Sequence, residues 1–177
     1  MYNYDPYAFL SPVPDFTLTS ESFAEGQTLP AAQVAAEAHP HGADRSPQLS
    51  WTGFPEGTRG FAVTMYDPDA PTASGFWHWA VTDVPASVTS IAEGAADTGP
   101  SAGLPDGALS LKNDAGIPGY MGAAPPEGHG THRYMFVVHA LDVESLGVSA
   151  DATPAVLGFN LHFHTIARAR LTGVYKR

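Results

Sequence analysis

Three segments of the chain carry side chains able to hold a small charged molecule. The run 67–71 (Asp-Pro-Asp-Ala-Pro) ends an apolar stretch, the run 76–79 (Phe-Trp-His-Trp) sets a histidine among aromatic rings, and a loop of small residues over 120–131 leads into 132–134 (His-Arg-Tyr). Each has an ordinary explanation when taken singly, because Asp and Pro are frequent in turns and a mid-strand histidine is usually a core residue. Their combination is the informative signal.

We predict that the three segments meet and that four of their side chains then converge: Asp67, His78, His132 and Tyr134. Two imidazoles and a phenol donate hydrogen bonds to an oxyanion, while Asp67 orients one imidazole and favours its charged form. The small residues at 122–124 let a ligand approach the backbone and its free N–H groups closely. This set favours a compact anion such as phosphate, phosphonate, acetate or a peptide carboxylate.

Strand alternation assigns these side chains to faces. His132 and Tyr134 are two apart and share a face, whereas Arg133 points the other way and is expected to bond a carboxylate or loop carbonyls rather than the ligand. The same alternation separates His78 from both tryptophans of the run 76–79.

Two rival chemistries have weaker support. Asp67, His78 and His132 supply three candidate zinc ligands, but no HExxH or similar spacing is present, and His162 and His164 do not share a helix face. A serine hydrolase lacks the G-x-S-x-G motif. We therefore predict no metal site, no cofactor and no catalytic residue.

Composition narrows the class of protein. The 177 residues suit a single domain over 1–177, and the absence of Cys excludes disulfides and a thiol nucleophile. With 18 acidic against 8 basic residues the net charge is -10, which argues against nucleic acid as a partner. The amino terminus does not resemble a signal peptide and no apolar run approaches a membrane span, so a cytoplasmic protein is expected.

The elements that must position these residues are mostly strands. Gly (18) and Pro (16) are abundant in a chain that is 44% hydrophobic, which favours short strands in a sandwich or barrel. Thr153-Pro154 predicts a helix start, because Thr suits the N-cap and Pro the first helical position. We expect an extended arm over 1–14, a long surface connection over 83–107 and one helical turn over 142–146. Alternating or apolar runs predict strands at 16–19, 48–54, 61–66, 76–82, 134–141 and 169–175.

The three segments, in this order, resemble the phosphatidylethanolamine-binding protein (PEBP) family, also called the Raf kinase inhibitor protein family, and most closely its bacterial branch. Further resemblance lies in 46–51 (Ser-Pro-Gln-Leu-Ser-Trp) and in the tail 166–175. The match extends over about 14–175, nearly the whole chain.

The resemblance implies a mainly β fold: a β-sandwich of two antiparallel sheets with a few peripheral helices. It also implies a cis peptide at Ala70–Pro71. The anion pocket of the family is lined by residues that correspond here to Asp67, His78, Gly122, Ala123, Ala124, Pro125, His132 and Tyr134. Ala124 replaces a more usual Gly or Cys. The long carboxyl-terminal helix of eukaryotic members is missing, so the pocket is more open or is covered by a second subunit in a homodimer.

Three functions follow, in order of support. The first is a binding or regulatory module for phosphate-, phosphoethanolamine- or carboxylate-bearing ligands, without turnover. The second is a protein-interaction role, such as inhibition of a protease or kinase through the pocket surface, although kinase inhibition belongs to eukaryotic members of the family. The third is a hydrolase that uses the His and Asp cluster as acid and base.

Overall fold

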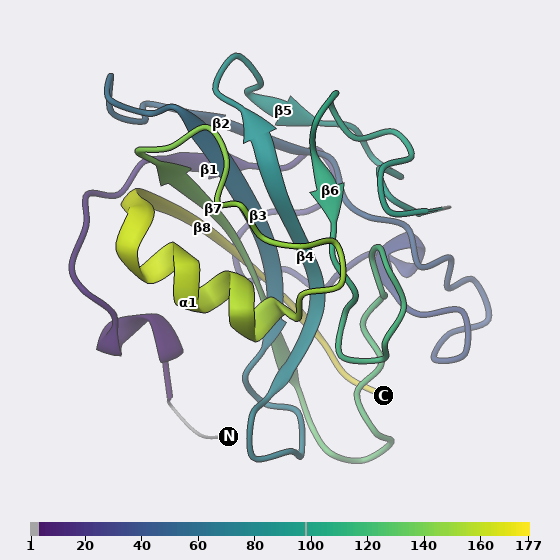
Figure 1. The fold of residues 1–177 in the computed structure, drawn as a ribbon. Helices are drawn as coiled ribbons and strands as arrows, with labels where there is room; N and C mark the ends of the chain where they lie inside the picture. The colour runs from purple at the N-terminus through teal and green to yellow at the C-terminus, as the bar shows by residue number, and fades with distance from the viewer. Residues whose placement is uncertain (1–3, 98) are drawn as a thin grey trace.

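The computed structural model describes residues 4–97 and 99–177 and consists of two antiparallel sheets with one α-helix in that part of the chain. The larger sheet has the order β6-β4-β3-β7-β8 and the smaller one the order β1-β2-β5 (Figure 1). The predicted sandwich with few helices is thus confirmed. The strands are β1 Thr17–Thr19, β2 Leu49–Thr52, β3 Gly60–Asp67, β4 Phe76–Pro85, β5 Ser90–Ile91, β6 Leu109–Ser110, β7 His132–Leu141 and β8 Thr165–Tyr175; the helices are η1 Pro6–Phe9, η2 Ala31–Gln33 and α1 Pro154–His164.

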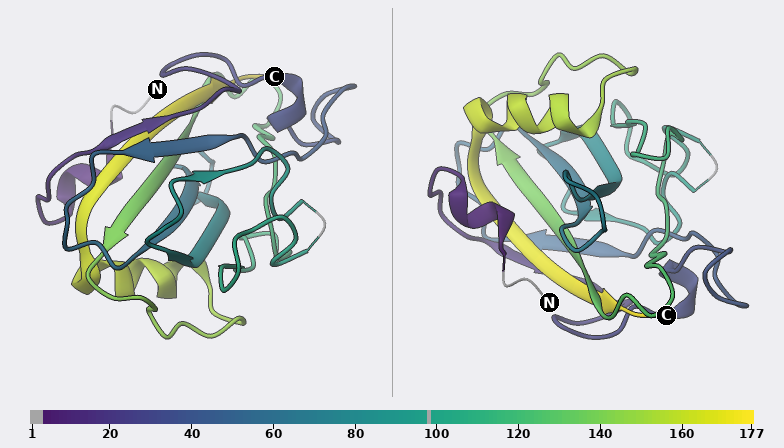
Figure 2. Two further views of the ribbon diagram at one scale, coloured as in Figure 1. Left: turned by 90° about the horizontal axis from the view of Figure 1, so that it is seen from above. Right: turned by 90° about the horizontal axis from the view of Figure 1, so that it is seen from below.

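The five-stranded sheet is covered on both faces. The small sheet packs on one face and α1 lies on the other (Figure 2). The main core between the sheets includes Trp51, Phe61 and Phe136, and a smaller cluster under the helix includes Ala62 and Leu157. All eight residues of β3 are buried, because this strand lies at the centre of the sheet and both its faces are covered.

A β-bulge in β4 changes which side chains share a face. Consecutive residues of β3 pair with Trp79 and Trp77, so His78 is an extra residue in the ladder. Trp77 therefore packs beside Tyr66 on the helix-covered face, with ring centroids 4.4 Å apart, whereas Trp79 belongs to the core between the sheets. His78 also faces that core, 5.2 Å from the Tyr134 ring. The predicted placement of both tryptophans on one face is wrong, because a bulge shifts the alternation by one residue.

Two predicted segments have a different local structure. The arm expected to be extended forms the short 3-10 helix η1, because Asp5 caps the Tyr7 N–H at 2.9 Å and Pro6 occupies the first helical turn; residues 1–3 lie outside the described residues. The segment 142–146 is not helical. Its backbone is held by distant partners instead, with the Leu146 N–H donating to Asp83 at 3.1 Å.

The helix α1 begins as predicted, with the Thr153 hydroxyl accepting from the Val156 N–H and Pro154 in the first turn. It has 11 residues. No helix in the described part of the chain is long and apolar enough to cross a membrane.

The turn after β3 does not contain the predicted cis peptide: the Ala70–Pro71 bond is trans. The chain reverses by other means, because the Asp69 N–H donates to the Asp67 carboxylate at 2.8 Å and the Thr72 N–H donates to the Ala70 carbonyl at 2.7 Å. A trans bond is the lower-energy form before proline unless tertiary contacts demand otherwise, and these bonds close the turn without the isomer.

Candidate functional site

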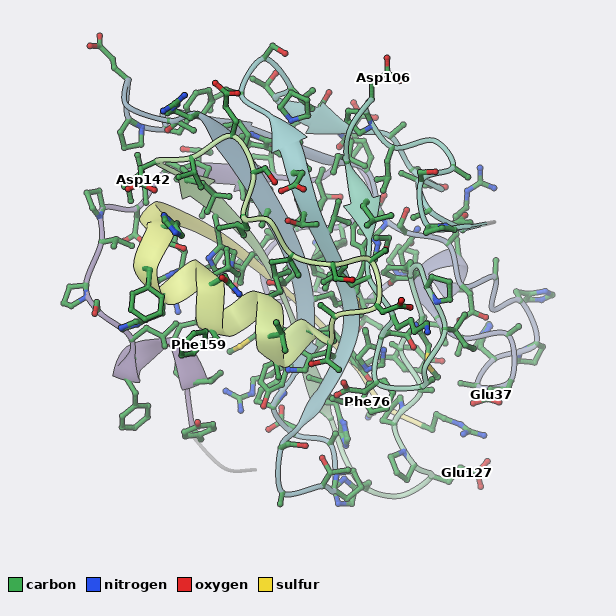
Figure 3. The ribbon with its side chains drawn as sticks, in the orientation of Figure 1. Glu37, Phe76, Asp106, Glu127, Asp142 and Phe159 are labelled. Atoms are coloured by element: carbon green, nitrogen blue, oxygen red, sulfur yellow. The ribbon has the colours of Figure 1, made fainter. Side chains whose placement is uncertain are left out.

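The structure brings the four predicted side chains to one end of the sandwich interior. Asp67 is the last residue of β3, His78 sits in the bulge of β4, and His132 and Tyr134 begin β7. They meet because β3 pairs with both β4 and β7, so the strand ends lie side by side. In Figure 3 this end of the sheet lies around the labelled Phe76, which pairs with Asp67 across the two strands.

Asp67 and His132 form a buried pair at the centre of this cluster. The His132 Nδ1–H donates to Asp67 Oδ2 at 2.7 Å, and the two residues are 1% and 3% exposed. Burial raises the pKa of Asp67, and the hydrogen bond from His132 offsets part of that rise. This bond fixes the ring of His132 and directs its Nε2 away from the carboxylate.

His129 contacts the second ring nitrogen of His132. The sequence analysis did not identify His129 as a site residue. Its Nδ1 lies 2.8 Å from His132 Nε2, so the carboxylate and the two imidazoles form one chain of hydrogen bonds. His129 itself is exposed on the loop before β7. The available signal was a pair of histidines three apart in a glycine-containing loop, which does not by itself predict contact.

His78 is neutral at pH 7. Its Nδ1–H donates to the Met121 carbonyl at 3.1 Å, and burial lowers its pKa to about 4, with the carbonyls of Met121 and Gly122 offsetting part of the effect. A neutral ring with Nδ1 protonated presents Nε2 as an acceptor. The prediction that both imidazoles act as donors therefore needs either protonation of His78 or a proton on the ligand.

The Tyr134 hydroxyl is the unsatisfied group of the cluster. Tyr134 is 0% exposed, and its hydroxyl has no hydrogen-bond partner in the described ranges. Burial raises the pKa of this phenol, so the hydroxyl keeps its proton. A buried donor without an acceptor costs about 1–3 kcal/mol, and a bound anion would remove that cost.

The loop over 122–125 differs from the prediction of free backbone donors. The Gly122 N–H donates to Asp44 at 2.8 Å and the Ala123 N–H donates to the Gln33 carbonyl at 3.2 Å, so neither is available to a ligand. Gly122 is required for close packing, because an added Cβ would collide with the backbone of residues 34 and 35. Sequence reasoning missed Asp44, whose carboxylate holds this loop.

The remaining loop residues lie nearer the unsatisfied hydroxyl. The Ala124 N–H lies beside the Tyr134 hydroxyl. Within residues 4–97 and 99–177, this N–H has no backbone acceptor. Pro125 is buried and has no N–H to offer. Ala124 is therefore the loop residue that still presents a backbone donor to the cluster.

The ion pair between Arg133 and Asp69 supports the cluster from outside the sandwich interior. Arg133 bonds a carboxylate rather than the ligand site, as predicted. Its guanidinium donates to both carboxylate oxygens at 2.8 Å, and its backbone N–H donates to the same carboxylate at 2.9 Å. Burial alone would raise the pKa of Asp69, but these bonds outweigh it and the pKa is lowered. The pair fastens the start of β7 to the turn after β3.

The cluster is closed rather than open. Its four side chains are 0–4% exposed, and they line none of four cavities of about 290–540 Å³ in the described structure. The alternative of a more open pocket is therefore wrong, because the His129 ring covers His132 Nε2, whereas coverage by a second subunit stays a prediction. Also, no group of three or more His, Asp or Glu side chains able to hold a metal ion occurs among residues 4–97 and 99–177.

Comparison with known proteins decides the family. The family model described as phosphatidylethanolamine-binding protein matches residues 19–176. The chain belongs to the PEBP family. It is 44% identical to YbhB of Escherichia coli K12 over 158 residues, which cover 89% of this chain and 98% of YbhB. It is also 43% identical to YbcL of the same organism over 163 residues, covering 91% of this chain and 87% of YbcL.

Solved structures agree with the fold. The crystal structure of E. coli YbcL, a member of the PEBP family, superposes with a TM-score of 0.86 at 42% identity and covers 92% of this chain and 99% of the other. A PEBP homologue from Chlamydia trachomatis gives a TM-score of 0.76 at 30% identity, covering 92% and 98%. The PEBP match contains every predicted site residue and leaves the first 18 residues, including η1, outside it.

Proposed function

We propose that this PEBP-family protein binds a small anion at the cluster of Asp67, His78, His132 and Tyr134, and does not turn it over. The anion is a phosphate, a phosphoethanolamine headgroup or a carboxylate. The observation that carries the proposal is the fully buried Tyr134 hydroxyl with no partner in the described chain, set beside an imidazole that a carboxylate orients.

Each group has a distinct part in holding the anion. The Tyr134 hydroxyl and the Ala124 N–H donate to one oxygen, because they lie beside each other. His132 donates from Nε2 when protonated, and Asp67 stabilises that charge on the opposite nitrogen. His78 Nε2 accepts from a ligand that carries its own proton, such as monohydrogen or dihydrogen phosphate.

The His129 ring must move away from His132 Nε2 before the anion binds. Its ring holds His132 Nε2, which is the atom that the anion needs. Because His129 lies on an exposed loop, the exchange requires only local movement. The proposal therefore includes a small barrier to entry, and removal of the His129 ring is expected to tighten binding.

The absence of turnover is argued from the partners of His132. Both its ring nitrogens are engaged, by a carboxylate and by another imidazole, and neither partner is a hydroxyl or thiol that an imidazole would activate. Inhibition of a protease or kinase through the same surface stays a prediction from the family resemblance.

The test is an NMR titration of the histidine side chains with phosphate, phosphoethanolamine and acetate in separate arms. We expect the His78 and His132 signals to move with millimolar to micromolar affinity. Binding should be lost in Tyr134→Phe and His132→Gln and should tighten in His129→Ala. The matched control is His41→Ala, which removes an exposed imidazole outside the cluster.

The three arms also identify the ligand source. Tighter binding of phosphoethanolamine than of phosphate indicates a headgroup, and preference for acetate indicates a carboxylate. Site signals that stay unmoved by all three anions, in a protein that remains folded, would overturn the proposal. Release of phosphate from phosphoethanolamine, followed by ³¹P NMR, would show that the protein is an enzyme instead.

A further inference from the structure

A cavity lies on the opposite face of the five-stranded sheet from the cluster of Asp67, His78, His132 and Tyr134, which we call the anion cluster. It has a volume of about 410 Å³ and lies between η1, α1 and the face of the sheet that α1 covers in Figure 2. Its size falls in the range of small-molecule sites. Its walls are largely apolar and include Leu10, Val13, Tyr66, Trp77 and Leu161.

Arg168 brings an unmatched charge to this cavity. The side chain is half-buried, its Nε is fully buried without a partner, and its Nη2 reaches only the Ser11 carbonyl at 3.5 Å. The described residues give it no carboxylate within ion-pair distance, although Asp15 acts on it from farther away. Its neighbour Arg170, by contrast, is paired with Asp5 at 2.9 Å.

Other polar side chains at the cavity are neutral, and the Tyr7 hydroxyl among them is unsatisfied in the described structure. The Tyr7 hydroxyl is buried beside that of Thr64, and neither makes a hydrogen bond of acceptable geometry in the described structure. His139 lines the cavity too, and burial together with the charge of Arg168 lowers its pKa to about 3. Arg168 is therefore the cationic anchor, and Tyr7 is a neutral donor close to it.

Gly158 keeps the helical wall of the cavity thin. It lies in the middle of α1 and lines the cavity, and an added Cβ would meet no atom within 4 Å. A glycine weakens a helix interior, so its presence where a larger residue would fit sterically is unexplained by packing. The glycine leaves room in this wall of the cavity.

We propose that this cavity binds an amphipathic monocarboxylate. The carboxylate pairs with the Arg168 guanidinium and accepts from the Tyr7 hydroxyl, and an alkyl tail of roughly ten carbons lies along Trp77 and Leu161. A carboxylate fits because it supplies the acceptors that Arg168 Nε and the Tyr7 hydroxyl lack. The apolar walls fit a tail and disfavour a bare ion such as phosphate.

The site is independent of the anion cluster. Part of its wall comes from residues 6–13, which precede the region 19–176 matched by the PEBP model. It also uses side chains on the helix-covered face of the sheet, whereas the anion cluster faces the sandwich interior. Either site can therefore fail while the other stands.

The test is calorimetric titration of the full chain with decanoate, with 1-decanol as the uncharged comparison. Decanoate is expected to bind in the micromolar range and to change Trp77 fluorescence. Arg168→Gln should weaken decanoate about tenfold or more and leave decanol unchanged. The control variant Arg59→Gln alters an exposed arginine and should change neither.

A pair of substitutions at one position tests the cavity without touching the charge. Gly158→Phe fills the space and should abolish binding of both probes, whereas Gly158→Ala should retain it. The proposal is overturned if wild-type protein binds no decanoate at millimolar concentration, or if Arg168→Gln and Gly158→Phe both bind it like wild type. Decanoate that moves the NMR signals of the His132 ring but not those of the Trp77 ring would place binding at the anion cluster. That result would overturn the proposal as well.

Discussion

Buried charge is paired at one end of the interior of the sandwich and unpaired at one position on the opposite face of the five-stranded sheet. Toward the small sheet, Asp67 is paired with His132 at 2.7 Å. Toward α1, Arg168 has no carboxylate partner within 4 Å in the described chain. The paired cluster is closed and the opposite face holds the 410 Å³ cavity. The difference teaches that a paired charge fixes two segments to each other, whereas an unpaired charge beside a cavity supports the proposed ligand site.

The buried histidines extend the comparison. His78 and His139 lie on opposite faces, and burial lowers their pKa values to about 4 and about 3. The ring nitrogens of these two histidines contact a carbonyl and a hydroxyl, which stabilise an imidazolium less than a carboxylate does, so burial keeps both rings neutral at pH 7.

The largest expected effect comes from breaking the ion pair between Asp69 and Arg133, which fastens the start of β7 to the turn after β3. Asp69→Asn leaves the Arg133 guanidinium without its counter-charge, and we expect the free energy of unfolding to fall by roughly 3 kcal/mol. Urea denaturation measures this change. Glu144→Gln, in the exposed pair with Arg59 at 2.9 Å, is the matched control and should cost less than about 1 kcal/mol. Equal losses of unfolding free energy in the two variants would show that the pair of Asp69 with Arg133 stabilises the fold no more than an exposed pair does.

Acid should destabilise the protein through the histidines of both faces. His78 and His139 have folded-state pKa values below the unfolded value of about 6.5, so the unfolded chain binds more protons between those limits. Stability is complete above about pH 6.5 and falls as the pH drops, by about 2 kcal/mol per histidine at pH 5. Urea midpoints from pH 7.5 to 5 measure the slope. His139→Leu should remove about half of it; an unchanged slope would count against burial as its cause.

Removing the unpaired charge of Arg168 should raise the free energy of unfolding, whereas breaking the ion pair between Asp69 and Arg133 should lower it. Arg168→Leu takes a half-buried guanidinium away from an apolar cavity, and we expect stability to rise by about 1 kcal/mol. Thermal unfolding at neutral pH, with no carboxylate in the buffer, is the measurement. Arg133→Leu is the comparison and should destabilise. If Arg168→Leu destabilised as strongly as Arg133→Leu, the contrast between the unpaired and the paired arginine would be lost.

The smallest effect is expected at the unsatisfied hydroxyl. Tyr134→Phe removes a buried donor without a described partner, so stability should stay within about 1 kcal/mol of wild type and rise rather than fall. Chemical denaturation in phosphate-free buffer tests this. Tyr66→Phe provides the control, because its hydroxyl donates to the Ser74 carbonyl at 2.8 Å and its loss should destabilise. A marked loss in Tyr134→Phe would mean that a partner exists in solution.

Much of the scaffold could be predicted from local pattern. The apolar run of β3, the capped start of α1 and the outward direction of Arg133 follow from periodicity, capping and strand alternation, which act within a few residues. The four converging side chains were proposed from the residues themselves, whereas the two-sheet arrangement and the full pocket lining came from the resemblance to the PEBP family, because pattern alone does not rank sheet topologies. The homodimer and the ligand itself stay predictions.

The features that sequence reasoning missed depend either on contacts across the chain or on a choice among local structures. The bulge at His78 is defined only by the register against β3, and the loss of free donors at Gly122 depends on Asp44, 78 residues earlier. The contact of His129 with His132 and the helical turn at Asp5 are local, but they compete with equally short alternatives. Local pattern does not choose among such alternatives.

By itself, the sequence determined which residues are candidates for a site and where the main strands lie, because side-chain type and strand period are properties of short stretches. Only the tertiary structure decided that the anion cluster is closed and that Arg168 faces an apolar cavity without a carboxylate in the described chain. Whether a buried group has a partner depends on atoms that distant segments place within about 3 Å, and hydrogen-bond energy falls steeply beyond that distance.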